Sequence, residues 1–252
     1  MSTLKNDTIV NLCDLYAQVS PVSGTVPYST QVPDLGVRAV TGDGREFRFA
    51  SAGAANLIVG QLEQSAAPQS NFQAVTAVAA AVGATSITLT VSTGTAVVAN
   101  QFSGGLFQTY GTVGNGGGQN LQISANNAVS ASGTSITITL ADPVQVAITT
   151  SATVNIIPPT YSALIQVPST ITGKVAGLAL GALVATYYGW VQVKGVANAL
   201  IAGTPAIGTG LSAPNAGTPG ALQVTAATLM DIATNLATGT NGQYGPVDLL
   251  IS

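Results

Sequence analysis

The chain has 252 residues, of which 46% are hydrophobic and only 6% are charged, with a formal net charge of −3. An ordinary soluble domain carries about 25% charged residues, so most of this surface must consist of Thr, Ser, Asn, Gln, Gly and Ala. Because net charge keeps proteins apart, we expect other copies or a larger assembly to cover much of it. The acidic balance gives no electrostatic reason to bind phosphate backbones, which argues against nucleic-acid binding.

Catalytic chemistry has few candidate residues in this sequence. It contains no histidine, and Cys13 is its single cysteine, which excludes Ser-His-Asp and Cys-His arrangements and metal sites built on His and Cys. Asp43 and Glu46 form a close carboxylate pair, but they alternate with arginines, which favours ion pairs over acid–base work. No recognisable motif surrounds Lys174 or Lys194 that would mark an activated nucleophile. We predict that the protein is not an enzyme and uses neither cofactor nor metal.

The first 65 residues hold most of the charge. Residues 4–19 are predicted to form a short helix, and the prolines at 21, 27 and 33 then favour extended backbone, so residues 1–34 are expected to be a helix and an arm. Residues 35–65 are expected to form a hairpin that leads into the core, with its turn at Gly42–Gly44. The N-terminus does not resemble a secretory signal, so synthesis in a cytoplasm is expected.

Residues 66–159 are predicted to form a β-domain, either independent or inserted into the C-terminal one. The run 74–82 fits a helix or a strand, whereas 83–91 alternates as a strand does and nearly repeats at 133–140, which predicts two similar strands of one sheet. Further strands are expected at 144–148 and 153–157. The glycine-rich loop 114–118 lacks the lysine and spacing of a phosphate-binding loop and is expected to be a flexible turn, or a tip packed closely on a neighbour.

Residues 160–252 are predicted to form a C-terminal β-barrel or sandwich, with strands at 163–167, 189–193, 197–201 and 247–251. Residues 225–236 are the best helix candidate but also fit a strand. The uncharged stretch 175–193 approaches the length of a membrane span, but its glycines and β-branched residues favour a strand, so no membrane partner is expected. The predicted fold class is mainly β, with short-strand antiparallel sandwich or barrel domains, an extended N-terminal arm and little helix.

Several stretches of this sequence, in this order, resemble a family of tailed-bacteriophage virion proteins that includes capsid decoration, or cement, proteins. The most distinctive are Gly44-Arg45-Glu46-Phe47-Arg48-Phe49 and Tyr187-Tyr188-Gly189-Trp190-Val191-Gln192; the others are 82–90, 95–102, Asp142-Pro143-Val144 and 203–206. The sequence departs from the family pattern at 114–119 and in its longer arm before Asp34.

The resemblance implies a β-rich structural protein on the virion capsid surface, commonly a homotrimer, that binds the outside of the major capsid protein shell and joins capsomers. It implies no catalytic residue. The candidate interface residues lie in the arm and the hairpin: Tyr28, Leu35, Arg38, Arg45, Phe47, Arg48 and Phe49. Two alternatives stay open. One is a tail or head-fibre component, although fibres usually show longer repeats; the other is a carbohydrate- or surface-binding β-module that uses Tyr187, Tyr188 and Trp190, although their apolar run favours core packing.

Overall fold

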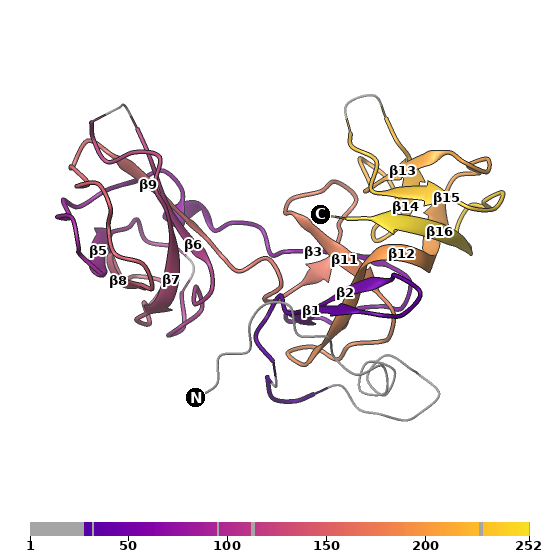
Figure 1. Ribbon diagram of the computed structural model, residues 1–252, viewed down its shortest axis with the longest axis horizontal. Coiled ribbons are helices and arrows are strands. Elements are labelled where there is room, and N and C mark those ends of the chain that lie inside the picture. The colour runs from indigo at the N-terminus through magenta and orange to yellow at the C-terminus, as the bar shows by residue number, and fades with distance from the viewer. Residues whose placement is uncertain (1–27, 32, 95, 112–113, 227–228, 252) are drawn as a thin grey trace. The chain divides into compact units, whose positions relative to one another are not determined.

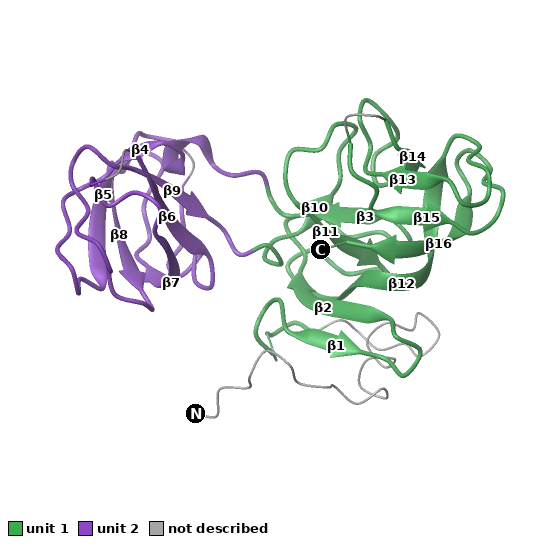
Figure 2. Cartoon of the chain, turned by 45° about the horizontal axis from the view of Figure 1, so that its top comes forward, with its two compact units in different colours: residues 1–66, 160–252 green, residues 67–159 purple. Residues whose placement is uncertain are grey.

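The computed structural model describes residues 28–31, 33–94, 96–111, 114–226 and 229–251. The chain divides into two compact units: unit 1 comprises the described residues of 1–66 and 160–252, and unit 2 is residues 67–159, inserted between the two parts of unit 1 (Figure 2). The expected mainly β fold is confirmed, because the described residues contain a single helical element, the 3-10 turn η1 (Ser70–Phe72). The predicted helix at 4–19 and most of the arm lie outside the described residues.

Unit 1 is built around one long strand, β12 (Tyr188–Ala202), which Figure 1 shows running through the unit. The other strands of its ten-stranded sheet are β1 (Arg38–Val40), β2 (Glu46–Ser51), β3 (Leu62–Gln64), β10 (Ile165–Gln166), β11 (Val175–Ala179), β13 (Gly210–Ser212), β14 (Leu222–Val224), β15 (Ala233–Asn235) and β16 (Tyr244–Leu250). Two separate strands were expected at 189–193 and 197–201. Gly195 instead continues the strand with a φ of +86°, which glycine adopts without a Cβ penalty.

The second half of β12 closes a five-stranded barrel. It pairs antiparallel with β16 and parallel with β14, and β13 and β15 complete the ring. Along β16, Val247 and Leu249 are buried and their neighbours are exposed, which is the period-two alternation of a strand with one face on a core. Together with Ala199 and Leu211 they fill the barrel interior.

The first half of β12 pairs with β2 on one side and with β11 on the other, and β11 continues the sheet through β3 to β10. Here Phe47 and Phe49 pack against Trp190 in a separate aromatic cluster. Phe49 is fully buried, with its ring 5.3 Å from Trp190 in an edge-on arrangement and 6.2 Å from Tyr188 in a stacked one. Burial of each such ring stabilises the unit by about 1.5–3 kcal/mol.

Unit 2 contains a six-stranded antiparallel sheet in the order β4 (Val75–Thr76), β9 (Thr153–Ile157), β6 (Leu106–Tyr110), β7 (Asn120–Asn126), β8 (Ser135–Leu140) and β5 (Ser86–Thr90). The two near-repeat strands belong to one sheet, as the sequence predicted, and the structure makes them direct neighbours. Ile87 pairs with Ile138 and Leu89 with Ile136, and all four point into the core of the unit. Their outward neighbours are Ser and Thr.

One sequence prediction needs correction, and two segments left open between helix and strand are decided. Residues 144–148 form no regular strand, since the backbone N–H groups of Gln145 and Val146 donate to the side chain of Gln119; Ile148 alone makes a bridge, to Ala80. The described part of 225–236 is not helical: Ile232 donates its N–H to Leu211 on β13, and β15 follows. Residues 74–82 are extended and not helical, because they contain β4 and a β-bridge from Ala80 to Ile148.

The apolar stretch 175–193 forms β11, a turn and the start of β12. Within the described residues, no helical segment has the length and hydropathy needed to cross a bilayer.

Candidate binding surfaces

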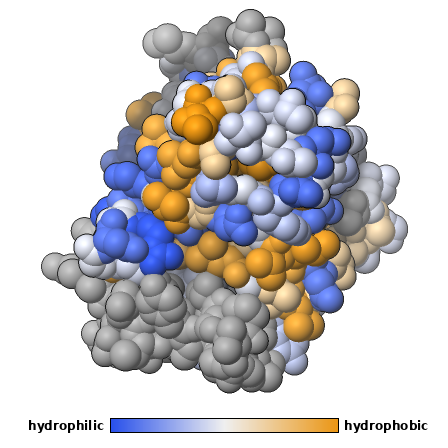
Figure 3. Space-filling view, turned by 90° about the vertical axis from the view of Figure 1, so that its right-hand side faces the viewer, coloured by the Kyte–Doolittle hydropathy of each residue, from blue (hydrophilic) through white to orange (hydrophobic). Residues whose placement is uncertain are grey.

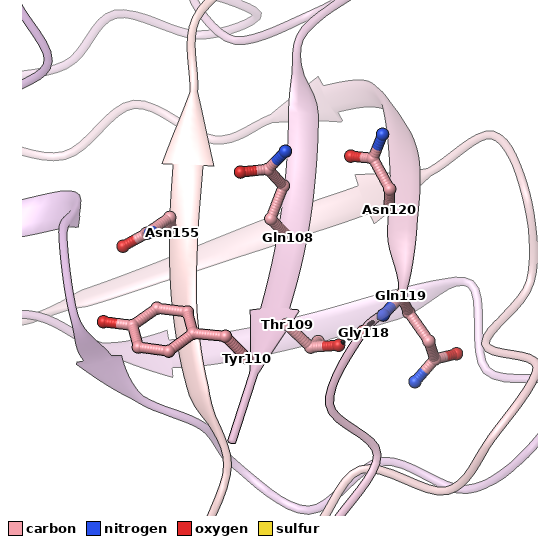
Figure 4. Close-up of a pocket in the computed structure, with 7 residues that line it drawn as sticks. All are labelled: Gln108, Thr109, Tyr110, Gly118, Gln119, Asn120 and Asn155. Atoms are coloured by element: carbon pink, nitrogen blue, oxygen red, sulfur yellow. Dashed lines mark hydrogen bonds between the residues drawn. The ribbon is translucent and has the colours of Figure 1, made fainter. Parts of the chain in front are cut away.

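Three carboxamide side chains form a row on the outer face of the unit 2 sheet. Gln108 on β6 lies directly opposite Asn155 on β9 and Asn120 on β7. Figure 4 shows the three projecting from three adjacent strands on the same side. With strands about 4.8 Å apart, the row is about 10 Å long. Within the described chain the amides of Gln108 and Asn120 form no hydrogen bond, while Asn155 Oδ1 accepts one from the N–H of Ala74 at 2.8 Å.

A shallow depression of about 390 Å³ lies over this row, and Tyr110 borders it. Tyr110 is 41% exposed and sits opposite Thr153, one outward position along β6 from Gln108. Its ring therefore offers an apolar surface beside a line of hydrogen-bonding groups (Figure 4).

The glycine loop 114–118 borders this depression, and Gly118 is one of the residues that line it. Thr109 Oγ1 donates to the carbonyl of Gly116 at 2.6 Å, and Gln119 Nε2 donates to the same oxygen at 2.8 Å. A Cβ on Gly116 would lie 2.5 Å from the carbonyl oxygen of Ala147, so only glycine fits there. The loop therefore packs closely on Ala147 and Ile148 of its own unit, and its contact with another copy stays a prediction.

Unit 2 carries almost no charge, because Asp142 is the single charged residue in 67–159. Most outward positions along its strands are occupied by Ser, Thr, Asn and Gln, and the apolar exceptions on β6 and β9 are Leu106, Tyr110 and Ile157. A ligand bound on this face would therefore meet dipoles and hydroxyls and no ion-pair partner.

The outer face of β12 and β16 in unit 1 carries apolar side chains between the polar residues Lys194, Asn198 and Asp248. Val196 and Tyr244 point outward with exposures of 57% and 49%, and Tyr244 lies opposite Leu200. Ile58 and Val59 adjoin Tyr244 around a depression of about 470 Å³. Figure 3, which faces this end of unit 1, shows hydrophobic residues gathered in bands. We call Ile58, Val59, Val196, Leu200 and Tyr244 the apolar face.

Gly60 seats the Tyr244 ring on this face. Its φ is +71°, and a Cβ there would lie 2.6 Å from Cε1 of Tyr244 and 3.0 Å from the carbonyl oxygen of Asn198. The backbone N–H of Leu200 donates to the carbonyl of Gly60 at 2.7 Å, which ties the loop to β12.

The seven interface candidates of the arm and hairpin lie together but contact mostly this chain. Arg38 forms a two-pronged ion pair with Glu46, at 2.7 and 3.0 Å, and this arginine is the main cause that lowers the pKa of Glu46. Arg45 pairs with Asp43 at 2.8 Å. The hydrogen bond from Thr41 is the main cause that lowers the pKa of Asp43.

The remaining candidates pack inward or bind the backbone. Arg48 Nη1 donates to the carbonyl of Gly36 at 2.9 Å. Phe47 and Phe49 are buried, so the expectation that their side chains touch a partner is corrected. Tyr28 and Leu35 are partly buried against the same cluster, and Tyr28 exchanges two backbone hydrogen bonds with Tyr188. An interface role for the candidates other than the two phenylalanines stays a prediction.

Trp190 is 6% exposed and belongs to the core, with Tyr188 packed against it. Tyr187 is partly buried against a neighbouring cluster. The core-packing interpretation of these aromatic residues is confirmed, and they do not form an exposed sugar-stacking platform.

Glu63 is a fully buried acid in β3. Neither of its carboxyl oxygens reaches a partner at hydrogen-bonding distance and angle in the described structure. Burial raises the pKa of Glu63 to about 9, and the nearby backbone amide of Ile58 offsets only part of this rise. The side chain is therefore a neutral acid at pH 7.

Among the described residues, no three His, Cys, Asp or Glu side chains gather where they could hold a metal ion. Fold and surfaces together define a two-unit, almost entirely β chain with one closed barrel and one amide-faced sheet. No protein-family model, curated protein or solved structure matches it.

Proposed function

We propose that this chain is a structural virion protein that decorates the outside of a tailed-phage capsid and joins capsomers of the major capsid protein as a homotrimer. Under this proposal it is made in the host cytoplasm and ends on the capsid surface. The observation that carries the proposal is the apolar face on the outside of the barrel, because a single-sided antiparallel sheet normally presents polar residues to water.

The position of these side chains in the strands argues for a covered surface. Val196 and Leu200 occupy the outward positions of β12, where their side chains cannot reach the barrel core. Leu200 lies opposite Tyr244, and Tyr244 and Ile58 line one depression, whereas Asn198 separates Val196 from Leu200. Apolar areas on soluble proteins usually mark contacts with other macromolecules. The scarcity of charge across the chain fits the same conclusion, since charge would be unfavourable in a permanently buried contact.

The resemblance to phage decoration proteins supplies the kind of assembly. Its two most distinctive stretches are register partners here: Phe49 pairs with Trp190 and Arg48 with Val191 across β2 and β12. The resemblance therefore rests on a pair of strands that build the unit 1 core. It supports a shared architecture, and the apolar face is then our candidate for the contact between copies or with the shell.

The first test is the solution mass by light scattering, alone and after sedimentation with shells of the major capsid protein. We expect a mass near three times the 24.9 kDa of one chain and co-sedimentation with shells. Ile58→Lys, which puts a charge beside Tyr244 on the apolar face, should lower the mass or release the protein from shells. Val82→Lys is the matched control, because Val82 is 64% exposed in unit 2. A wild-type monomer that ignores shells would contradict the proposal.

A further inference from the structure

We propose that the outer face of the unit 2 sheet binds a neutral carbohydrate, with Asn155, Gln108 and Asn120 as hydrogen-bonding residues and Tyr110 as the stacking residue. This inference is independent of capsid binding, since it concerns a different surface in the other unit.

The first argument is hydrogen-bonding complementarity. A carboxamide presents a donor and an acceptor side by side, and vicinal hydroxyls of a sugar present the same pair of functions. Three carboxamides in register across β9, β6 and β7 repeat this pair at the strand spacing of about 4.8 Å. The row is as long as about two linked hexose rings.

The second argument is that two of these three amides, those of Gln108 and Asn120, are not used to hold the fold, whereas Asn155 accepts a hydrogen bond from Ala74. The side chains of Gln108 and Asn120 make no hydrogen bond in the described chain, whereas the adjacent Gln119 uses its amide for four: to Gly116, twice to Val146, and to Gln145. The amide of Gln119 therefore holds the fold, whereas those of Gln108 and Asn120 remain available to a ligand. Two uncommitted amides at the mouth of a depression suit a ligand better than a packing role.

The third argument comes from Tyr110 and from charge. The exposed Tyr110 ring lies beside the row, where the C–H face of a sugar could pack on it while its hydroxyls reach the amides. Asp142 is the single charge in the unit, so phosphate, sulfate or carboxylate groups find no cation here. A neutral glycan satisfies all of these features.

The test applies the full-length protein to an array of neutral and anionic oligosaccharides, followed by titration calorimetry with the best neutral binder. We expect binding to neutral glycans, with affinity lowered about tenfold or more in Tyr110→Ala and in Gln108→Ala, the loss of roughly one stacking or hydrogen-bonding contact. Thr88→Ala changes an exposed residue on the same face, three strands from β6, and should bind within about twofold of wild type.

Three outcomes would overturn the inference. In the first, the protein binds no neutral glycan on the array. In the second, it binds anionic glycans alone. In the third, neither Tyr110→Ala nor Gln108→Ala weakens the binding. A fourth would reassign the face: if Tyr110→Ala lowers the solution mass, the sheet packs against a second copy. Circular dichroism and melting of each variant exclude unfolding as the cause, and an unchanged shell-binding assay separates this result from the capsid proposal.

Discussion

Glu63 on β3 and Gly177 on β11 lie directly opposite each other, so the buried carboxyl of Glu63 faces a residue without a side chain. A Cβ on Gly177 would lie 2.8 Å from Cγ2 of Val191, which shows how closely β11 and β12 pack at this point. Gln166 lies opposite Glu63 on the other side, but its amide donates elsewhere, so the buried carboxyl has no hydrogen-bonding partner in the described chain and its charged form is unfavourable.

Stability should consequently fall as the pH rises. Burial raises the pKa of Glu63 from 4.5 in the unfolded chain to about 9 in the folded protein. Below pH 4.5 both states are protonated; between the two values the unfolded state loses a proton that the folded state keeps. The free energy of unfolding should decline by up to about 1.4 kcal/mol per pH unit in this window. Chemical unfolding at pH 5, 7 and 8.5 measures it.

Glu63→Gln is the control for this prediction, because the amide is neutral at every pH and similar in size. The variant should match wild type near pH 5 and exceed its stability at pH 8.5. Parallel pH profiles for the two proteins would show that Glu63 is not the group responsible.

Gly60→Ala should destabilise unit 1 more than Gly44→Ala does. Both glycines have positive φ, +71° and +85°, which costs about 1–2 kcal/mol for alanine. No atom lies within 4 Å of a Cβ on Gly44, whereas one on Gly60 meets the Tyr244 ring. Urea unfolding should show an additional loss of about 1–3 kcal/mol for Gly60→Ala. Equal losses would mean that the ring moves aside without strain.

Phe49→Ala should destabilise unit 1 by about 3–5 kcal/mol, because it removes the ring around which Tyr28, Tyr188 and Trp190 pack. Trp190 is the chain's single tryptophan, so its fluorescence reports the unfolding of this unit. Phe107→Ala makes the same change in the unit 2 core. It should leave the tryptophan transition in place, and a shift of similar size would show that the two units unfold together.

Replacement of residues 67–159 by a short Gly-Ser linker should leave unit 1 folded. The strands before and after the insertion, β3 and β10, pair antiparallel, with Gln64 opposite Ile165. The two attachment points therefore belong to an ordinary hairpin, and loop length adds little entropy, about 0.6 kcal/mol per doubling. A native-like tryptophan spectrum and a cooperative transition would meet this expectation; loss of both would contradict it.

Local pattern predicted local structure well in this chain. The alternating Ser-Ile-Thr-Leu-Thr stretch at 86–90 and its near-repeat carried enough information to predict two strands of one sheet. Pattern failed at 144–148, where a side chain 26 residues away, Gln119, takes the backbone donors that a strand would use. The hydrophobic pattern also failed to predict that β12 continues through Gly195. The residues around a glycine do not show whether a strand ends there or continues.

The candidate sites could not be predicted, because they depend on the register in which strands pair, and the sequence does not show this register. Asn155, Gln108 and Asn120 are far apart in the chain and look like ordinary polar strand residues until the pairing of three strands aligns them. Phe47 and Phe49 were the reverse case: their place in the hairpin suggested an interface, but both rings are buried in a cluster with Val37, Ala39 and Trp190. The buried state of Glu63 was likewise hidden, because it ended a charged segment and looked like a surface residue.

The insertion of unit 2 also sets an order of events during synthesis. β1, β2 and β3 leave the ribosome first, but β10, β11 and β12, which pair with β2 and β3, follow only after all of 67–159 has been translated. Unit 2 has its own hydrophobic core, so it can fold on the nascent chain. At that stage the early strands still have unpaired edges. During this interval the aromatic hairpin of β2 is open to aggregation, and a chaperone or a slow translation rate would act on that segment first.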